Sequence, residues 1–350
     1  MTQIESTNSS RKVISSNSVV STAEHGSIRG YLFIAIATLC WGAAATLGRA
    51  IFTGRIQLGG ATLKPIDPLI LAQTRTTFAF LILMPLLLMN RGTNGVRMRR
   101  RDLVHCMILG FAGVAGSNYF YYLSIQKTSV ATAIILQYLA PVFVLFYMLA
   151  RRLQPASAQR LSGVSLAVIG SVLAIGVVGW TGSFPFIGIR TGDVRFNTAG
   201  VVAGLVAAVC FAFSNVFGHH LVAATDRWPV MVYAMMGASI GWLIVNPPWK
   251  IVAAHYSGTQ WLFLLVFAIA SMLIPYSFYF AGLQYLDATR AIVTSCLEPV
   301  FAISIAALAL GELLGRVQIV GIIVTLAATV LIQLPDKSAK AEAMQLELME

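Results

Sequence analysis

Residues 121–143 read YYLSIQKTSVATAIILQYLAPVF, and residues 279–301 read YFAGLQYLDATRAIVTSCLEPVF. The second stretch repeats the first without a gap, 158 positions later, so that Pro141 aligns with Pro299. A repeat on this scale indicates that one structural unit was duplicated. Since each copy consists of apolar runs of helix length, the sequence predicts a duplicated membrane protein.

The composition indicates that lipid is the solvent for most of the chain. Hydrophobic residues make up 57% of the sequence and charged residues only 11%, less than half of the charged share of an ordinary soluble domain. The apolar runs are continuous rather than alternating, which favours helices over the strands of a barrel. A helix crosses the bilayer core with roughly 20 apolar residues. Runs that meet this requirement cover residues 31–51, 68–89, 103–125, 128–150, 161–180, 198–222, 229–247, 261–285, 288–310 and 317–334.

These runs predict an all-α polytopic membrane protein of ten transmembrane helices, arranged as two five-helix repeats. Because five is an odd number, the second repeat enters the membrane from the opposite side, and a pseudo-two-fold axis in the membrane plane relates the copies. The predicted parts are a disordered tail (1–29), the first repeat (30–181), an extracytoplasmic linker (182–197), the second repeat (198–334) and a C-terminal tail (335–350).

Charge and cysteine placement bear on orientation and cofactors. Lys and Arg are about twice as frequent on the side of the two termini as on the opposite side, which predicts cytoplasmic termini. The net charge of +11 therefore reflects orientation in the membrane rather than nucleic-acid binding. The four cysteines lie in predicted spans with spacings that suit neither a metal site nor a disulfide framework, so we expect no metal or other cofactor.

Three motifs within the repeats are specific. Cys-Trp-Gly occupies residues 40–42, Pro68 is followed by Arg75, and residues 297–321 contain L-E-P-V, L-G-E and Q-x-x-G in that order. In these motifs the chain resembles the drug/metabolite transporter superfamily, in its EamA-domain branch of ten-span carriers. The resemblance covers residues 30–334. It implies an inner-membrane carrier that exports or exchanges small polar metabolites.

The glutamate of the final motif is Glu312. The first repeat has Gln154 at the corresponding position, so the role that the resemblance implies for this glutamate applies to Glu312 alone. Glu312 and Arg316 are spaced i, i+4, which predicts a local ion pair at the outer end of the last two spans. That position leaves a gating role open.

Glu298 is the leading functional candidate, because it lies within an apolar run where a charge costs several kcal/mol. The carboxyl group must be protonated, paired or in contact with water, which suits proton exchange during transport. The alternative is a structural carboxyl that bonds backbone freed by Pro299. The first repeat has Ala140 at this position, so the carboxyl group breaks the pseudo-symmetry.

Arg75 is the second charge within a predicted span. Its guanidinium can bind a substrate carboxylate or phosphate with two parallel hydrogen bonds. Two other interpretations remain: the side chain extends toward the outer interface, or it forms a salt bridge with Glu298.

Further polar and aromatic residues are predicted to line a substrate cavity at the membrane midplane. For the tyrosines, an aromatic belt at the membrane surface is the alternative. Pro141 and Pro299 are predicted hinges, since proline bends a helix by removing a backbone donor. The predicted substrate-binding set comprises Arg75 together with Trp41, Asn118, Tyr121, Gln137, Tyr138, Ser214, Asn215, Tyr276 and Tyr279.

The resulting hypothesis is a secondary transporter that exports a small polar metabolite, such as an amino acid or related compound, across the cytoplasmic membrane. Uptake or exchange is the alternative direction, and a receptor or scaffold is the alternative class. Catalytic motifs of hydrolases and metalloproteases and the phosphate-binding loop of ATP-driven pumps are absent from the sequence, which argues against an enzyme. The expected partners are the substrate, the lipid bilayer and, for coupled transport, protons. The sequence carries no signal for oligomeric state.

Overall fold

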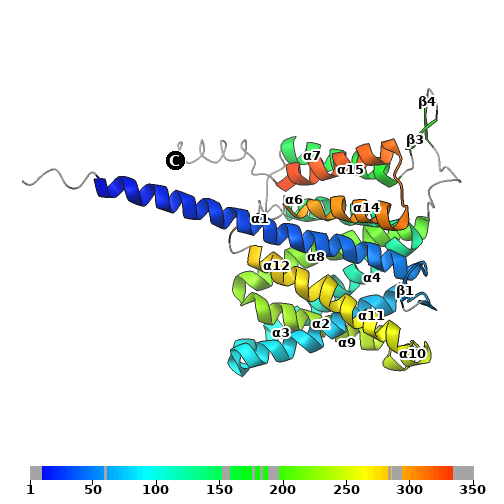
Figure 1. The fold of residues 1–350 in the computed structure, drawn as a ribbon, viewed down its shortest axis with the longest axis horizontal. Helices are drawn as coiled ribbons and strands as arrows, with labels where there is room; N and C mark the ends of the chain where they lie inside the picture. Colours follow the sequence, from blue (N-terminus) through cyan, green and yellow to red (C-terminus); the bar gives the residue numbers. More distant parts are fainter. Residues whose placement is uncertain are drawn as a thin grey trace, which may run out of the picture.

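The long helices run roughly side by side, the short hairpins lie at one end of the bundle, and other connections lie at both ends (Figure 1). Within some helices, residues 10–27 among them, only the backbone is described. The computed structural model describes residues 10–58, 61–151, 158–175, 178–181, 184–187, 197–282, 285 and 294–333.

Two helices of the first half begin at recognisable capping residues. The Asp67 side chain accepts a hydrogen bond from the Leu69 N–H at the start of the second helix, and Ser129 does the same for the Thr132 N–H of the fifth. The elements are α1 (Ser10–Phe52), β1 (Gln57–Leu58), β2 (Ala61–Thr62), α2 (Pro68–Arg91), the 3₁₀ turn η1 (Thr93–Val96), α3 (Arg100–Ile108), the π-helical segment η2 (Leu109–Ala115), α4 (Gly116–Lys127), α5 (Val130–Gln137), α6 (Ala140–Ala150) and α7 (Ala158–Ile175).

The second half uses the same devices. Asn197 and Asp226 cap two helices, and Ser257 with Gln260 forms a reciprocal capping box at a third. Its elements, after the hairpin of β3 (Val178–Thr181) and β4 (Phe184–Ile187), are α8 (Thr198–Ala224), α9 (Arg227–Val245), α10 (Pro248–Ala253), α11 (Gly258–Ala268), the π-helical segment η3 (Ile269–Leu273), α12 (Ile274–Gly282), α14 (Leu297–Leu310) and α15 (Arg316–Gln333).

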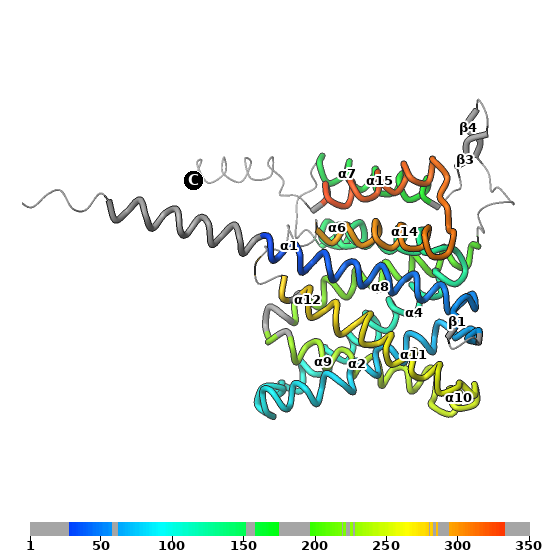
Figure 2. The backbone as a smooth tube through the Cα atoms, in the orientation of Figure 1, coloured from blue at the N-terminus to red at the C-terminus, as the bar shows by residue number. Residues whose placement is uncertain are grey.

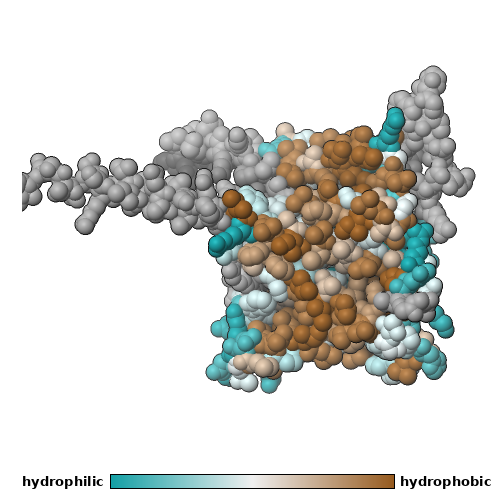
Figure 3. Space-filling view, in the orientation of Figure 1, coloured by the Kyte–Doolittle hydropathy of each residue, from teal (hydrophilic) through white to brown (hydrophobic). Residues whose placement is uncertain are grey.

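Among the described residues, seven helices are long and apolar enough to cross a membrane. The other three predicted spans correspond to the shorter apolar helices α7, α14 and α15. The described part of the chain is therefore that of an all-helical multi-pass membrane protein apart from two short hairpins, while the count of ten crossings stays a prediction. Figure 3 agrees with this assignment, since the exposed surface is apolar over the middle of the bundle and hydrophilic toward both ends.

Two boundaries differ from the sequence-based expectation. α7, which corresponds to the fifth predicted span, ends at Ile175 rather than at residue 180, because Val178–Thr181 pairs with Phe184–Ile187 in a hairpin. Valine, tryptophan and threonine favour strands, and Gly176 is a residue type that commonly ends helices. At the other end of the chain, α1 begins at Ser10, within the tail that we expected to be disordered. The first proline is Pro65, so no proline interrupts the chain before α1 ends.

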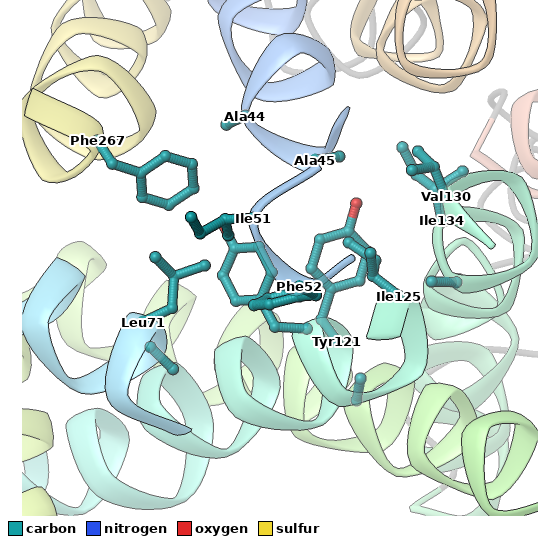
Figure 4. Close-up of a cluster of buried hydrophobic side chains, with 14 of the residues drawn as sticks. Ala44, Ala45, Ile51, Phe52, Leu71, Tyr121, Ile125, Val130, Ile134 and Phe267 are labelled. Atoms are coloured by element: carbon teal, nitrogen blue, oxygen red, sulfur yellow. The ribbon is translucent and has the colours of Figure 1, made fainter. Parts of the chain in front are cut away.

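Contacts between the two halves hold the bundle together. α1 packs on α12 and α14, α4 packs on α8, α2 on α9, and α7 on α15. Figure 2 shows α7 and α15 at one side of the bundle and α2 and α9 at the other. The main hydrophobic core joins α1, α2, α4 and α5 to Phe267 of α11, and Tyr121 lies within it (Figure 4).

The α7–α15 contact depends on a close approach of two helix backbones. A Cβ atom added to Gly321 would lie 2.4 Å from the Ala174 nitrogen and 2.6 Å from the Gly170 oxygen. Helices pack tightly in a membrane through such small residues, since the hydrophobic effect does not drive them together in lipid.

Replacing Gly321 with alanine should therefore separate α7 from α15 and destabilise the protein by about 1–3 kcal/mol. We expect a lower thermal unfolding temperature of the purified protein in detergent. Gly258→Ala is the matched control, because a Cβ atom there meets nothing within 4 Å. Equal unfolding temperatures for the two variants would contradict the packing role.

Candidate functional site

Arg75 is buried between the halves, with a relative exposure of 8%. Its Nη1 donates to the Asn118 Oδ1 at 2.6 Å and to the Tyr122 hydroxyl at 3.0 Å, and its Nη2 donates to the Ser271 carbonyl at 2.6 Å. The guanidinium also lies over the Tyr122 ring, 5.6 Å from its centroid. The side chain thus does not extend to the membrane surface. It ties α2 and α4 of the first half to η3 of the second.

The Ser271 carbonyl is available because of Pro275. Proline has no N–H, so the carbonyl four residues earlier lacks its usual helical donor, and the π-helical segment η3 lies just before this proline. A free carbonyl inside a membrane needs another donor. Arg75 supplies that donor.

The first half contains a comparable arrangement without a proline. The π-helical segment η2 precedes α4, and the Asn118 Nδ2 donates to the Val114 carbonyl within it at 2.7 Å. Asn118 therefore uses its amide nitrogen on its own helix and offers its oxygen to Arg75. Both π-helical segments lie next to the same arginine, as such segments often do near functional sites.

Glu298 lies in the first turn of α14, where the positive end of the helix dipole favours a carboxylate. The Tyr138 hydroxyl lies 3.5 Å from the Glu298 Oε2 and donates to the Ser295 carbonyl at 2.8 Å. Pro299 removes the helical donor for the Ser295 carbonyl, just as Pro275 does for the Ser271 carbonyl. Tyr138 of the first half thereby contacts the start of α14 in the second.

Ion pairs among the described residues join Arg49 to Glu312 and Arg91 to Asp226. The salt bridge between Arg75 and Glu298 that the sequence left open is therefore not formed. The predicted Glu312–Arg316 pair is also wrong, because Glu312 pairs with Arg49 of α1 instead. Gly311 explains the difference: its left-handed backbone (φ 66°) ends α14 and redirects the chain before Glu312.

Aromatic side chains from both halves meet beside these groups. The Trp41 ring of α1 lies 5.4 Å from the Tyr276 ring and 5.5 Å from the Tyr279 ring of α12, centroid to centroid. All three side chains are half-buried. Tyr121 is buried in the core nearby, and its hydroxyl has no hydrogen-bond partner within the described structure.

Of the remaining predicted residues, two contact α4 or η2 and one is exposed. The Gln137 Nε2 donates to the Ser117 hydroxyl at 3.3 Å, and the Ser214 side chain faces Gly113 of η2. Asn215 is exposed and donates to the Phe211 carbonyl of its own helix, so the structure does not place it with the other candidates.

Pro141 and Pro299 both coincide with helix interruptions. α5 ends at Gln137 and α6 begins at Ala140, so Pro141 lies in the first turn after the break. Pro299 lies in the first turn of α14, directly after the turn at Cys296. The breaks lie at corresponding positions of the two repeats, whereas rocking about them stays a prediction.

Sequence reasoning missed the backbone acceptors. Ser271 and Ser295 contribute carbonyl oxygens rather than side chains, and no residue preference marks such a role. A signal was nevertheless present, because each serine lies four residues before a proline in an apolar run. Tyr122 was also missing from the predicted site, although it both bonds and covers Arg75.

Replacing Arg75 with lysine should destabilise the protein by about 2–5 kcal/mol. A single ammonium group cannot reach all three acceptors, and each buried acceptor left without a donor costs about 1–3 kcal/mol. Tyr122→Phe removes only one acceptor and should cost about 1 kcal/mol. Thermal unfolding of the two purified variants in detergent tests this order. An unfolding temperature for Arg75→Lys equal to that of the wild type would show that these bonds contribute little.

Comparisons with known proteins agree with this description. YicL of Salmonella typhimurium, an uncharacterized inner membrane transporter by name, is 26% identical over 319 residues, which are 90% of this chain and 98% of that protein. An uncharacterized transporter of Archaeoglobus fulgidus is 24% identical over 288 residues, 80% of this chain and 92% of that one. A solved structure, described as the crystal structure of a protein, superimposes with a TM-score of 0.54 at 17% sequence identity. The alignment covers 93% of this chain and 99% of the solved one, and it shows similarity of fold alone.

The family comparison is more specific than any single relative. The model of the EamA-like transporter family matches residues 28–176 and matches again over residues 198–334. Together the two matches cover most of the sequence and both sets of helices that contribute to the cluster. The chain therefore belongs to the EamA-like transporter family, within the drug/metabolite transporter superfamily.

Proposed function

We propose that the protein is a secondary transporter of the inner membrane that exports a small polar metabolite, such as an amino acid or related compound, by alternating access. One observation carries this proposal. Arg75, Tyr138 and the aromatic side chains form a polar cluster whose bonds cross between the two halves. Polar and charged groups are expensive in a membrane interior and usually mark a substrate or ion path.

The helix contacts support ten crossings in two inverted repeats. α1 begins the first half and packs on α12 and α14, while α8 begins the second half and packs on α4, α5 and α6. Exchanging the two halves therefore turns the contacts of α1 into those of α8. The π-helical segments η2 and η3 also overlap when the sequence is shifted by 158 positions. Two related halves can open toward opposite sides with little difference in free energy.

The orientation proposed is that of the charge distribution, with the termini in the cytoplasm. β1–β2, β3–β4 and α10 then lie at the outer end of the bundle (Figure 1). This end, which also carries the connection between α14 and α15, is named the hairpin end below.

Substrate is proposed to bind beside Glu298, on the surface that half-buried side chains leave accessible. Trp41, Tyr276 and Tyr279 offer ring faces there. The tyrosines, Tyr138 among them, also offer hydroxyl groups. Glu298 is the proposed proton carrier, because no ion pair among the described residues holds its charge. Facilitated diffusion is the alternative that needs no ionisable group.

Efflux from proteoliposomes that contain only this protein tests both points. The vesicles are preloaded with a mixed pool of amino acids and small metabolites and assayed with and without a pH gradient. We expect one compound class to leave the vesicles, several-fold faster with the gradient. Glu298→Gln should abolish the effect of the gradient, since the amide cannot carry a proton.

Asp102→Asn is the matched control, because it makes the same chemical change in the first turn of α3. It should leave gradient-driven efflux unchanged. Efflux that ignores the gradient in wild type and Glu298→Gln alike would make the protein a facilitator and Glu298 structural. Absence of efflux for every compound would count against the carrier and favour a receptor role.

Pro141→Ala and Pro299→Ala should slow efflux about tenfold while expression stays within about twofold of the wild type. Alanine restores a backbone N–H and straightens the helix. At residue 299 the restored N–H also competes with Tyr138 for the Ser295 carbonyl. Efflux at the normal rate in both variants would exclude the hinge role.

A further inference from the structure

Arg49 and Glu312 form an ion pair at the hairpin end. The Arg49 Nε donates to the Glu312 Oε1 at 2.8 Å, and the side chains are only 13% and 20% exposed. Arg49 belongs to α1 of the first half and Glu312 to the α14–α15 connection of the second. The pair therefore joins the halves where substrate would leave an exporter.

Each partner also binds a helix end. The Arg49 Nη1 donates to the carbonyls of Ile125 and Gln126 at 2.7 and 2.8 Å, in the last turn of α4. The Glu312 Oε2 accepts the Val130 N–H at 3.3 Å, in the first turn of α5. The cation thus lies at the negative end of one helix dipole and the carboxylate at the positive end of another. Both charges satisfy backbone groups that have no helical partner.

A second arginine strengthens the contact between halves. The Arg55 Nη1 donates to the Leu310 carbonyl at 2.6 Å, in the last turn of α14. Separating the halves at the hairpin end therefore breaks the ion pair, the Val130 bond and the Arg55 bond together. Contacts that are lost together make opening an all-or-none step rather than a gradual one.

The two repeats differ at these positions in sequence. Glu312 aligns with Gln154 at the offset of 158, and Arg49 aligns with His219, as Gly48 aligns with Gly218. An amide and an imidazole cannot form the carboxylate–guanidinium pair. The sequence positions that align with Arg49 and Glu312 therefore carry no such ion pair.

We propose that the Arg49–Glu312 pair is a one-sided lock that keeps the hairpin end closed in the empty carrier. The inference rests on the proposed function. The sequence positions that align with the lock carry no such pair, and the Arg91–Asp226 pair at the other end is far more exposed, at 41% and 48% against 13% and 20%, so the lock favours the state that is closed at the hairpin end. The empty carrier then accepts substrate from the opposite side, while the net direction of transport follows the gradients of the substrate and of any coupled proton. Substrate binding must supply the free energy that opens the lock.

The test measures the conformation directly, without substrate. Spin labels replace Thr53, at the exposed end of α1, and Leu313, which is 84% exposed beside the lock. The background carries Cys40, Cys106, Cys210 and Cys296 as serine. In lipid nanodiscs, pulsed electron-spin resonance should give one short distance for the otherwise wild-type chain. Glu312→Gln and Arg49→Gln should each raise a longer-distance population at least about fivefold.

The pair between Arg91 and Asp226 provides the matched control. It also joins the two halves, through α2 and the start of α9, but its side chains are 41% and 48% exposed. Arg91→Gln should leave the Thr53–Leu313 distance unchanged. An equal opening in Arg91→Gln would show a general loss of stability and overturn the lock.

The same samples also report, by thermal unfolding, whether each variant is folded. Glu312→Gln keeps an oxygen that can accept the Val130 N–H, and Arg49→Lys keeps the positive charge, so both should remain folded by thermal unfolding. A wild-type distance in folded Glu312→Gln and Arg49→Gln overturns the lock, whatever the efflux assay shows. Opening of these variants without efflux of any compound supports the lock and contradicts the carrier function instead.

Discussion

The structure depends on one constraint: a backbone carbonyl in the membrane interior must find a hydrogen-bond donor. Pro275 and Pro299 each remove the helical donor of the carbonyl four residues earlier. Arg75 supplies a donor to the Ser271 carbonyl and Tyr138 supplies one to the Ser295 carbonyl. Both donors come from the first half and both acceptors from the second. The two carbonyls that lack a helical donor because of these prolines thus form polar contacts between the halves.

This arrangement explains why polar groups gather where they do. A soluble protein can leave a freed carbonyl to water, whereas a membrane protein must place a charged or hydroxyl side chain opposite it. Such a side chain is buried with its bonds pointing at the partner half. Any movement of one half against the other therefore changes the bonds of Arg75 and Tyr138. In the alternating-access cycle proposed above, these are contacts that change between the two states.

How well a feature can be predicted from the sequence depends on how far apart in the chain its interacting residues lie. Apolar runs depend on the residue and its solvent, so most helices appeared at the predicted places, and the breaks at Pro141 and Pro299 follow from the missing N–H. Glu312 was assigned to the wrong partner, because Arg316 is near in sequence whereas Arg49 is near only after folding. Asn215 was assigned to the cluster on polarity alone, although it faces away and bonds its own helix.

The sequence by itself determined the solvent, the helical class, the duplication and the positions at which helices break, because these depend on composition, periodicity and proline chemistry. Tertiary structure alone decided which carbonyl meets Arg75, which hydroxyl meets Glu298 and which arginine meets Glu312. Each of these contacts joins residues more than 150 positions apart. The direction of a side chain at such a distance depends on how helices pack, and glycine contacts such as Gly170 with Gly321 allow that close packing.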